Sequence, residues 1–207
     1  MKKFEMLYQD GDHRWGVIAR DPEKAGYIID TNEYLVAQGD AGMLLDPGGA
    51  EIFPAVFSAL TKGFDPRHVR YVFASHQDPD IASSLALWRE VNTEIKCLVS
   101  WLWGGFLPHY GVEESVFITI PDEGMPFHLG RLTLQLVPAH YLHSPGNFNV
   151  YDPQAKILFS GDIGAALLPA DAGLFVEDFS AHIRHAEMFH RRWMGSNEAK
   201  RRWCGRV

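Results

Sequence analysis

Short apolar runs bounded by turn residues are the feature of this sequence that most constrains its fold. Runs rich in β-branched and aromatic residues predict buried strands, and amphipathic stretches between them predict helices. The expected strands are 3–8, 34–37, 42–45, 69–74, 94–100, 116–120, 132–137, 149–151 and 157–159, and the expected helices between them are 52–62 and 81–91. Because strands outnumber helices and helices stand between groups of strands, this order predicts an α+β fold. Two sheets would face each other with helices outside, as an αββα sandwich.

A cluster of potential metal ligands follows the apolar run 69–74. Residues 75–81 read Ser-His-Gln-Asp-Pro-Asp-Ile and place one imidazole, His76, beside the carboxylates of Asp78 and Asp80. Loops at strand ends often carry functional groups, and imidazole with carboxylate is a common ligand set for transition metals. The cluster therefore indicates a metal site. An acidic turn that caps a helix beginning at Ile81 explains the same residues, so the cluster alone leaves both interpretations open.

Two further candidate ligands occupy the same place relative to a strand. His143 lies in the segment 139–147, directly after the expected strand 132–137, and Asp162 directly follows the expected strand 157–159. Rigid strands hold ligands in place, whereas the loops at their ends carry them. The repetition predicts that the candidate ligands meet at one edge of a layered β-scaffold.

These residues resemble the metallo-β-lactamase fold and, within it, the diiron domain of the flavodiiron proteins. That family's pattern is His-x-Glu-x-Asp-His, then a His after a long gap, then an Asp and a final His. His76, Asp78 and Asp80 match the first cluster with Asp in place of Glu. His143 matches the later His, and Asp162, with 18 residues between it and His143, matches the bridging carboxylate.

The resemblance runs from about Tyr27 to Asp162 and includes the Leu-Leu-Asp-Pro-Gly-Gly segment at 44–49. It is greatest to the stand-alone oxygen-binding diiron proteins (ODP), which lack a flavin domain and are associated with sensing in bacteria. It implies one metallo-β-lactamase-like domain over residues 1–207 that binds dioxygen for sensing or reduction. A flavodoxin-like domain does not fit into 207 residues beside this fold, so no flavin is expected in this chain. Turnover would then need an external electron donor, and sensing a signalling partner.

The resemblance also assigns the ligands of two iron ions. His76, Asp78, His143 and Asp162 would hold the first ion, while Asp80 and the bridging Asp162 would hold the second. Ile81 stands where the family usually has a second His, so the second ion would lack an imidazole.

The C-terminal region carries a second departure from the family pattern, because the family's last His lies further along than Val207. Residues after 177 predict a helix with an apolar stripe, a break at 195–197 and a second helix reaching Trp203 without a closing strand. The stripe consists of Phe179, Ile183, Ala186, Phe189 and Trp193. Either the second metal site is weak or the chain is a fragment of a longer protein, and we expect a truncated C-terminus.

Ligand chemistry separates two classes of function. Hydrolytic members of the fold carry an imidazole-rich set suited to zinc, whereas Asp78 replaces one of those imidazoles with a carboxylate. Harder oxygen ligands shift the preference toward iron or manganese. Iron can exchange electrons with dioxygen, while zinc supplies only Lewis-acid and hydroxide chemistry. A diiron protein that binds dioxygen is therefore the first hypothesis, and a metal-dependent hydrolase is the alternative.

Three other histidines lie in positions where a ligand role has to be considered. His182 and His185 share one face of a predicted helix and could join a metal, but without a nearby carboxylate loop they are expected to pack or to face solvent. His140 competes with His143 for the ligand role or acts as a hydrogen-bond donor behind it. The family pattern, with Ser-Pro following, favours His143.

Composition and charge exclude other classes. With 46% hydrophobic and 22% charged residues and no apolar run near eighteen residues, neither membrane insertion nor secretion is expected. Cys97 and Cys204 are isolated, which is typical of a reducing cytoplasm. From residue 184 onward the chain carries a local charge of +5, and the remaining body carries −12. An acidic body argues against nucleic acid as a partner, and the basic tail could dock on the body or on another subunit of a homodimer.

Overall fold

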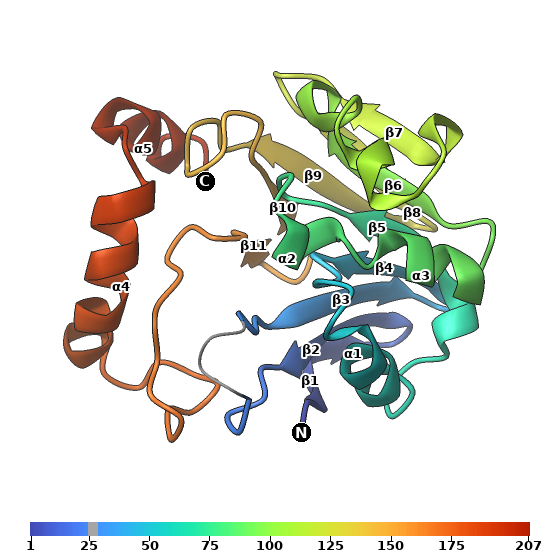
Figure 1. The fold of residues 1–207 in the computed structure, drawn as a ribbon, viewed down its shortest axis with the longest axis horizontal. Helices are drawn as coiled ribbons and strands as arrows, with labels where there is room; N and C mark the ends of the chain where they lie inside the picture. Colours follow the sequence, from blue (N-terminus) through green and yellow to red (C-terminus); the bar gives the residue numbers. More distant parts are fainter. Residues whose placement is uncertain (25–28) are drawn as a thin grey trace.

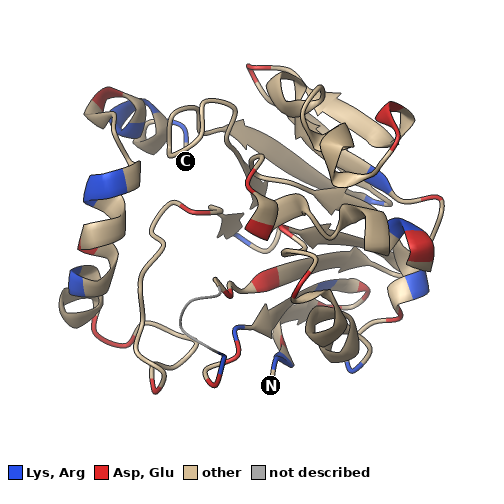
Figure 2. Ribbon diagram, in the orientation of Figure 1, with Lys and Arg blue, Asp and Glu red and all other residues tan. Residues whose placement is uncertain are grey.

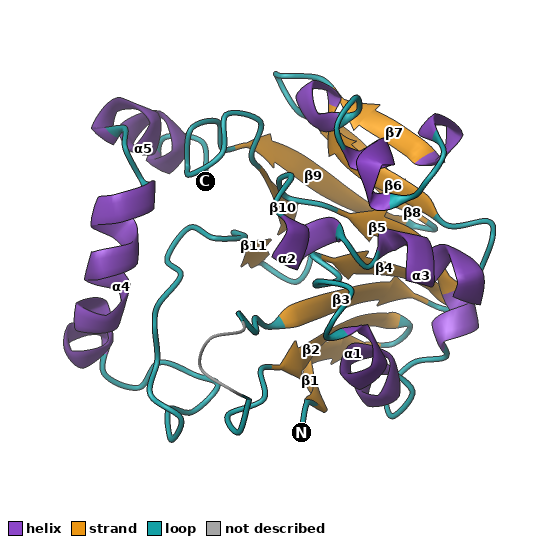
Figure 3. Ribbon diagram, viewed as in Figure 1, coloured by secondary structure: helices purple, strands orange, loops and turns teal. Residues whose placement is uncertain are grey.

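The computed structural model describes residues 1–24 and 29–207, and Tyr27, where the family resemblance begins, lies outside the described residues. The described residues form two sheets that face each other (Figures 1 and 3). The first sheet has seven strands in chain order: β1 (Lys3–Asp10), β2 (His13–Ala19), β3 (Glu33–Gln38), β4 (Ala41–Leu45), β5 (Val69–Phe73), β6 (Lys96–Ser100) and β7 (Phe117–Ile120). It is antiparallel from β1 to β4 and parallel from β4 to β7.

The second sheet is antiparallel and has the order β11-β10-β9-β8. Its strands are β8 (Met125–Leu129), β9 (Leu132–Pro138), β10 (Phe148–Asp152) and β11 (Ile157–Phe159). The helices are α1 (Phe53–Leu60), α2 (Pro79–Ala82), α3 (Leu85–Val91), α4 (Phe179–Trp193) and α5 (Asn197–Cys204). Short 3-10 helices occupy Pro66–His68, Trp101–Trp103, Leu107–Tyr110 and Glu114–Val116.

Alternation along the strands of the first sheet builds two separate cores. On β4, Leu44 packs among residues of α1, α2 and α3, whereas Met43 and Leu45 pack between the two sheets. On β5, Val72 and Phe73 divide in the same way. Successive side chains of a strand point to opposite faces, so a sheet that is covered on both faces needs apolar residues at every position. Strand β4 and the end of β5 are therefore continuous apolar runs.

Helix α5 contacts the outer face of the second sheet at β10. Phe148 and Val150 of β10 point into the core between the sheets, so Asn149 points outward, where its Oδ1 accepts a hydrogen bond of 2.7 Å from Trp203 Nε1. Arg206 Nη1 also donates to the carbonyl oxygen of Pro138, at 3.1 Å. With α1, α2 and α3 on the other side, the layers agree with the expected αββα sandwich, which is confirmed.

The structure differs from the sequence-based expectation in three elements. Strands β2 and β8 were not expected, and the helix expected at 81–91 is divided into α2 and α3. The division falls at Ser84, whose Oγ donates to the carbonyl oxygen of Gly48 at 2.7 Å. This bond ties the helix break to the loop that follows β4, and it thereby positions that loop beside the candidate site.

Helices α4 and α5 are present as expected, with the break between them. Every residue of α4 and α5 is described, and none of them is buried. Phe179 is 69% exposed and Ile183 is 49% exposed, so much of the apolar stripe faces outward. Figure 2 marks the Lys and Arg positions along these helices in blue. Across the described ranges, the helices are too short or too polar to traverse a lipid bilayer.

Candidate metal centre

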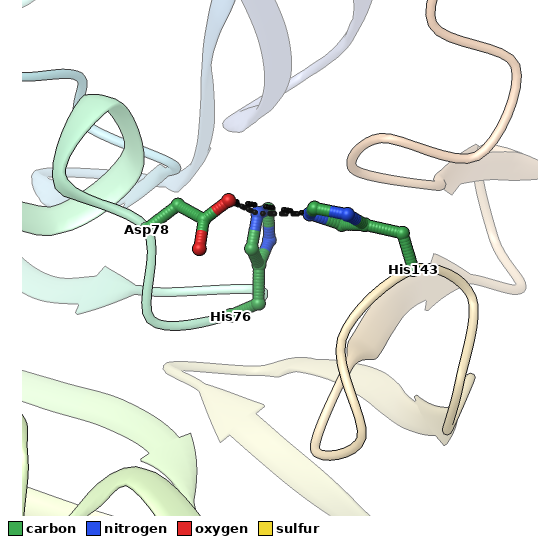
Figure 4. A group of neighbouring side chains, drawn as sticks. All are labelled: His76, Asp78 and His143. Carbon is green, nitrogen blue, oxygen red and sulfur yellow. Dashed lines mark hydrogen bonds and ion pairs between the residues drawn. The ribbon is translucent and has the colours of Figure 1, made fainter. Parts of the chain in front are cut away.

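Three loops that follow strand ends bring the candidate ligands together. His76 and Asp78 follow β5, His143 lies in the loop between β9 and β10, and Asp162 follows β11. Figure 4 shows the side chains of His76, Asp78 and His143 pointing toward one another. One ligand atom from each of these three residues lies within 4.8 Å of the others. The expectation that ligands from separate strand ends meet at one edge of the sandwich agrees with this arrangement.

The distances among the ligand atoms suit a single ion. The two Nε2 atoms of His76 and His143 are 3.1 Å apart. Asp78 Oδ2 lies 3.4 Å from His76 Nε2 and 3.3 Å from His143 Nε2, and Asp162 Oδ2 lies 3.7 Å and 3.5 Å from the same two atoms. Four ligands placed about 2.1 Å from a tetrahedral ion would be separated by about 3.4 Å. His76, Asp78 and His143 therefore converge on one position that suits a divalent transition metal, and Asp162 lies beside both imidazoles but outside the converging group.

Asp80 occupies a different position from the other carboxylates. It lies in the first turn of α2 and is not in the group of converging ligand atoms, as far as the described residues show. Burial raises the pKa of Asp80, and the charges of Asp162 and Asp78 raise it further. The next residue, Ile81, is buried in the helix-side core. The role of Asp80 as a ligand of a second ion therefore stays a prediction.

The electrostatics of the site favour a bound cation. Burial lowers the pKa of His76, but the hydrogen bond with Asp78 and the charges of Asp46 and Asp162 outweigh burial, so the pKa lies above its usual value. Hydrogen bonds with His143 and then His76 hold the pKa of Asp78 well below its usual range. Carboxylates are thus crowded around two imidazoles. A metal ion would replace the protons that this arrangement attracts.

His76 is oriented from behind by a buried hydrogen-bond relay. Asp46 accepts hydrogen bonds from the Ser75 backbone N–H at 2.7 Å and from Ser75 Oγ at 2.6 Å. Ser75 Oγ also lies 2.8 Å from His76 Nδ1. Because the Ser75 hydroxyl donates its single hydrogen to Asp46, it accepts from His76 Nδ1–H, and the Nε2 lone pair of His76 is left free for an ion. Burial raises the pKa of Asp46 to about 7.

We expect the Ser75→Ala variant to bind a divalent metal about 10–100-fold more weakly, the range typical of lost hydrogen bonds to a metal-binding histidine. The substitution leaves His76 Nδ1–H without its acceptor in a buried site and frees the imidazole to rotate. Titration of the metal-free protein with Co²⁺ measures the affinity. The exposed Ser115→Ala variant is the matched control, and an unchanged affinity in Ser75→Ala would show that the relay does not orient His76.

The other histidines do not join the converging group within the described residues. His140 Nε2 lies 2.8 Å from the carbonyl oxygen of Asp122, and its ring contacts Phe148 edge-on. His182 and His185 line a cavity of about 520 Å³ beside Asp162. This cavity runs between α4 and the sandwich, so α4 forms one wall of the space next to the site.

Two residues of the site's surroundings had no assigned role in the sequence. These residues are Asp46 and Gln77. For Asp46 the sequence did carry a signal, because the segment 44–49 that contains it resembles the family's strand-to-loop signature. The Oδ1 atom of Asp78 accepts a hydrogen bond of 2.8 Å from Gln77 Nε2, a contact for which the sequence carries no signal.

The comparisons with known proteins agree with this geometry. The family model described as "ODP family beta lactamase" matches residues 29–207. A solved structure described as the apo state of the chemotaxis sensor ODP from T. denticola is 38% identical to this chain, with a TM-score of 0.85, over 98% of this chain and 80% of that chain. Another, described as the peroxy diiron species of chemotaxis sensor ODP, is 37% identical with a TM-score of 0.84, over 97% and 80% of the two chains.

The curated relatives are longer proteins. Diflavin flavoprotein A 1 of Synechocystis is 28% identical over 156 residues, which cover 72% of this chain and 27% of the relative. The chain spans about a quarter to a third of the length of the curated relatives that it matches.

Proposed function

The chain belongs to the ODP family of beta-lactamase-like proteins, and from this membership we propose that it is a non-haem diiron protein that binds dioxygen. The observation that carries the proposal is the convergence of His76, Asp78 and His143, with Asp162 beside them, at the strand ends of this fold. The solved structures at 37% and 38% identity belong to an ODP chemotaxis sensor, and one of them is described as a diiron species. The family and the ligand set thus support the same chemistry.

The proposed ligand set gives each side chain a defined task. His76 and His143 would donate their Nε2 lone pairs to the first iron, and Asp78 and Asp162 would each offer Oδ2. Asp162 would also serve the second iron, with Asp80 as that ion's own carboxylate. Two irons supply the ability to change oxidation state when dioxygen binds. The relay through Ser75 and Asp46 would keep the His76 lone pair aimed at the ion.

The donor set supports iron, or manganese, over zinc. Asp78 contributes an oxygen where hydrolytic members of the fold carry a nitrogen, and harder oxygen ligands favour iron and manganese. Burial raises the pKa of Asp80, and the charges of Asp162 and Asp78 raise it further. A second cation near Asp80 and Asp162 would relieve that repulsion.

We propose oxygen sensing as the role of this binding. The residues that the structure describes form the sandwich and its C-terminal helices, and no flavin-binding domain lies among them. The solved structures at 37% and 38% identity are described as a chemotaxis sensor ODP, which supports a sensing role. Sensing would need a signalling partner or a second copy of the chain, and repeated reduction of oxygen would need electrons from outside the described residues. Among the described residues, Cys97 and Cys204 are free thiols, which suits a reducing cytoplasm.

The test is anaerobic purification followed by metal analysis and exposure to air. We expect about two irons per chain and a new ligand-to-metal charge-transfer absorption band that depends on oxygen. Stoichiometric zinc, no oxygen-dependent spectrum and turnover of a thioester or phosphodiester would contradict the proposal. That outcome would favour a metal-dependent hydrolase instead.

A further inference from the structure

The two oxygens of the Asp78 carboxylate have different surroundings. Oδ2 faces His76 Nε2 and His143 Nε2 at 3.4 Å and 3.3 Å. Oδ1 accepts a hydrogen bond of 2.8 Å from Gln77 Nε2. One oxygen is therefore free to meet an ion, and the other is held by an amide.

The Gln77 amide can adopt only one orientation here. A carboxylate accepts hydrogen bonds and cannot donate them, so the amide NH₂ must face Asp78. The amide oxygen Oε1 then accepts from Ser144 Oγ, at 2.7 Å. Ser144 is 3% exposed and follows His143 in the chain. Ser144, in the loop of His143, thus donates to Gln77, and Gln77 donates to Asp78.

The backbone of Gln77 is held as well. Tyr110 donates its hydroxyl hydrogen to the carbonyl oxygen of Gln77, at 2.7 Å. The side chain and the main chain of Gln77 are therefore anchored by different segments. This double anchoring limits the positions that the amide can reach.

Asp78 has a competing use for its carboxylate. It is the N-cap residue of α2 with extended backbone angles, and Pro79 follows it, which is the usual setting for an Asp that caps the first turn. Yet its side chain makes no capping hydrogen bond to the described residues of α2. The bond from Gln77 holds Oδ1 away from those backbone N–H groups.

We infer that Gln77 is a positioning residue: it holds Asp78 as a single-oxygen metal ligand, away from the cap of α2, and couples Asp78 to the loop of His143 through Ser144. The inference rests on the proposed function only in assuming that a metal binds here. It requires neither iron nor oxygen in particular, so Co²⁺ can serve as the probe.

The experiment titrates the metal-free full chain with Co²⁺ and records the visible d–d absorption bands, which report the coordination number. We expect Gln77→Ala and Ser144→Ala to shift these bands and to weaken Co²⁺ binding about 10–100-fold, as lost hydrogen bonds to metal ligands do. Gln77→Glu keeps the size but replaces the donor with an acceptor, so it should be affected as strongly as Gln77→Ala. The Tyr110→Phe variant removes the bond to the Gln77 backbone and should weaken binding less than Gln77→Ala does, because the side-chain bonds of Gln77 remain. The exposed Ser115→Ala variant is the control and is expected to keep the parental bands.

Parental bands and affinity in both Gln77→Ala and Gln77→Glu would overturn the inference. If Gln77→Ala does not fold, judged by circular dichroism of the metal-free protein, Ser144→Ala tests the same chain of hydrogen bonds from its other end. A parent protein that binds Co²⁺ at this site but never binds iron or oxygen would contradict the proposed function and leave the role of Gln77 measurable.

Discussion

The Asp162→Ala variant is expected to bind neither iron ion, whereas the parent chain binds two under the proposed assignment. Asp162 Oδ2 lies 3.7 Å and 3.5 Å from the two imidazole Nε2 atoms, and its charge is one of those that raise the pKa of Asp80. In the proposed assignment this single carboxylate serves both ions, so its loss removes an oxygen ligand from each. Iron per chain after anaerobic reconstitution measures the effect.

A thermal measurement separates loss of the site from loss of the fold. An ion that binds the native state alone raises the melting temperature, so ferrous iron should stabilise the parent and leave Asp162→Ala unchanged. The control is the Asp171→Ala variant, which removes an exposed carboxylate from the loop between β11 and α4 and should behave like the parent. Full iron loading in Asp162→Ala would show that Asp162 is not the shared ligand.

Strand β8 shows why part of the fold escaped prediction. Its sequence, Met-Pro-Phe-His-Leu, contains Pro126, which argues against a strand when it is read alone. In the structure β8 is an edge strand of the second sheet, where one side of the backbone has no strand partner and a proline is tolerated. The identity of an edge depends on the whole sheet order and is not encoded in five residues.

Part of the candidate site could be predicted from local sequence, and the rest depends on contacts between residues far apart in the chain. His76, His143 and Asp162 could be located because each one follows an apolar run, and strand ends that share an edge bring such residues together. The relay behind His76 joins Ser75 to Asp46 across 29 positions of the chain, and Ser144 reaches Gln77 across 67. Hydrogen bonds of this kind depend on how the loops pack against one another, so no local pattern in the sequence predicts them.

A second buried carboxylate, Asp152, joins the two sheets. Its Oδ2 accepts a hydrogen bond of 2.6 Å from Trp15 Nε1 and lies 2.7 Å from His13 Nε2. Both partners belong to β2 of the first sheet, whereas Asp152 ends β10 of the second. Its Oδ1 accepts from the backbone N–H groups of Gln154 and Ala155 at 3.0 Å and 3.1 Å. Trp15 and Asp152 are fully buried, and His13 is 2% exposed.

We expect Asp152→Ala to lower the free energy of unfolding by about 3–5 kcal/mol, the range for removing one partner of a buried, hydrogen-bonded pair. Trp15 Nε1–H and His13 Nε2 would be left without their acceptor in the core, and the turn at 153–155 would lose its anchor. Asp152→Asn should cost less, because its amide oxygen still accepts from Trp15. Urea unfolding of the metal-free variants measures both values, and a loss below about 1 kcal/mol in Asp152→Ala would contradict the assignment. Since this carboxylate connects strands of different sheets, its removal should weaken the association of the sheets and lower the global stability.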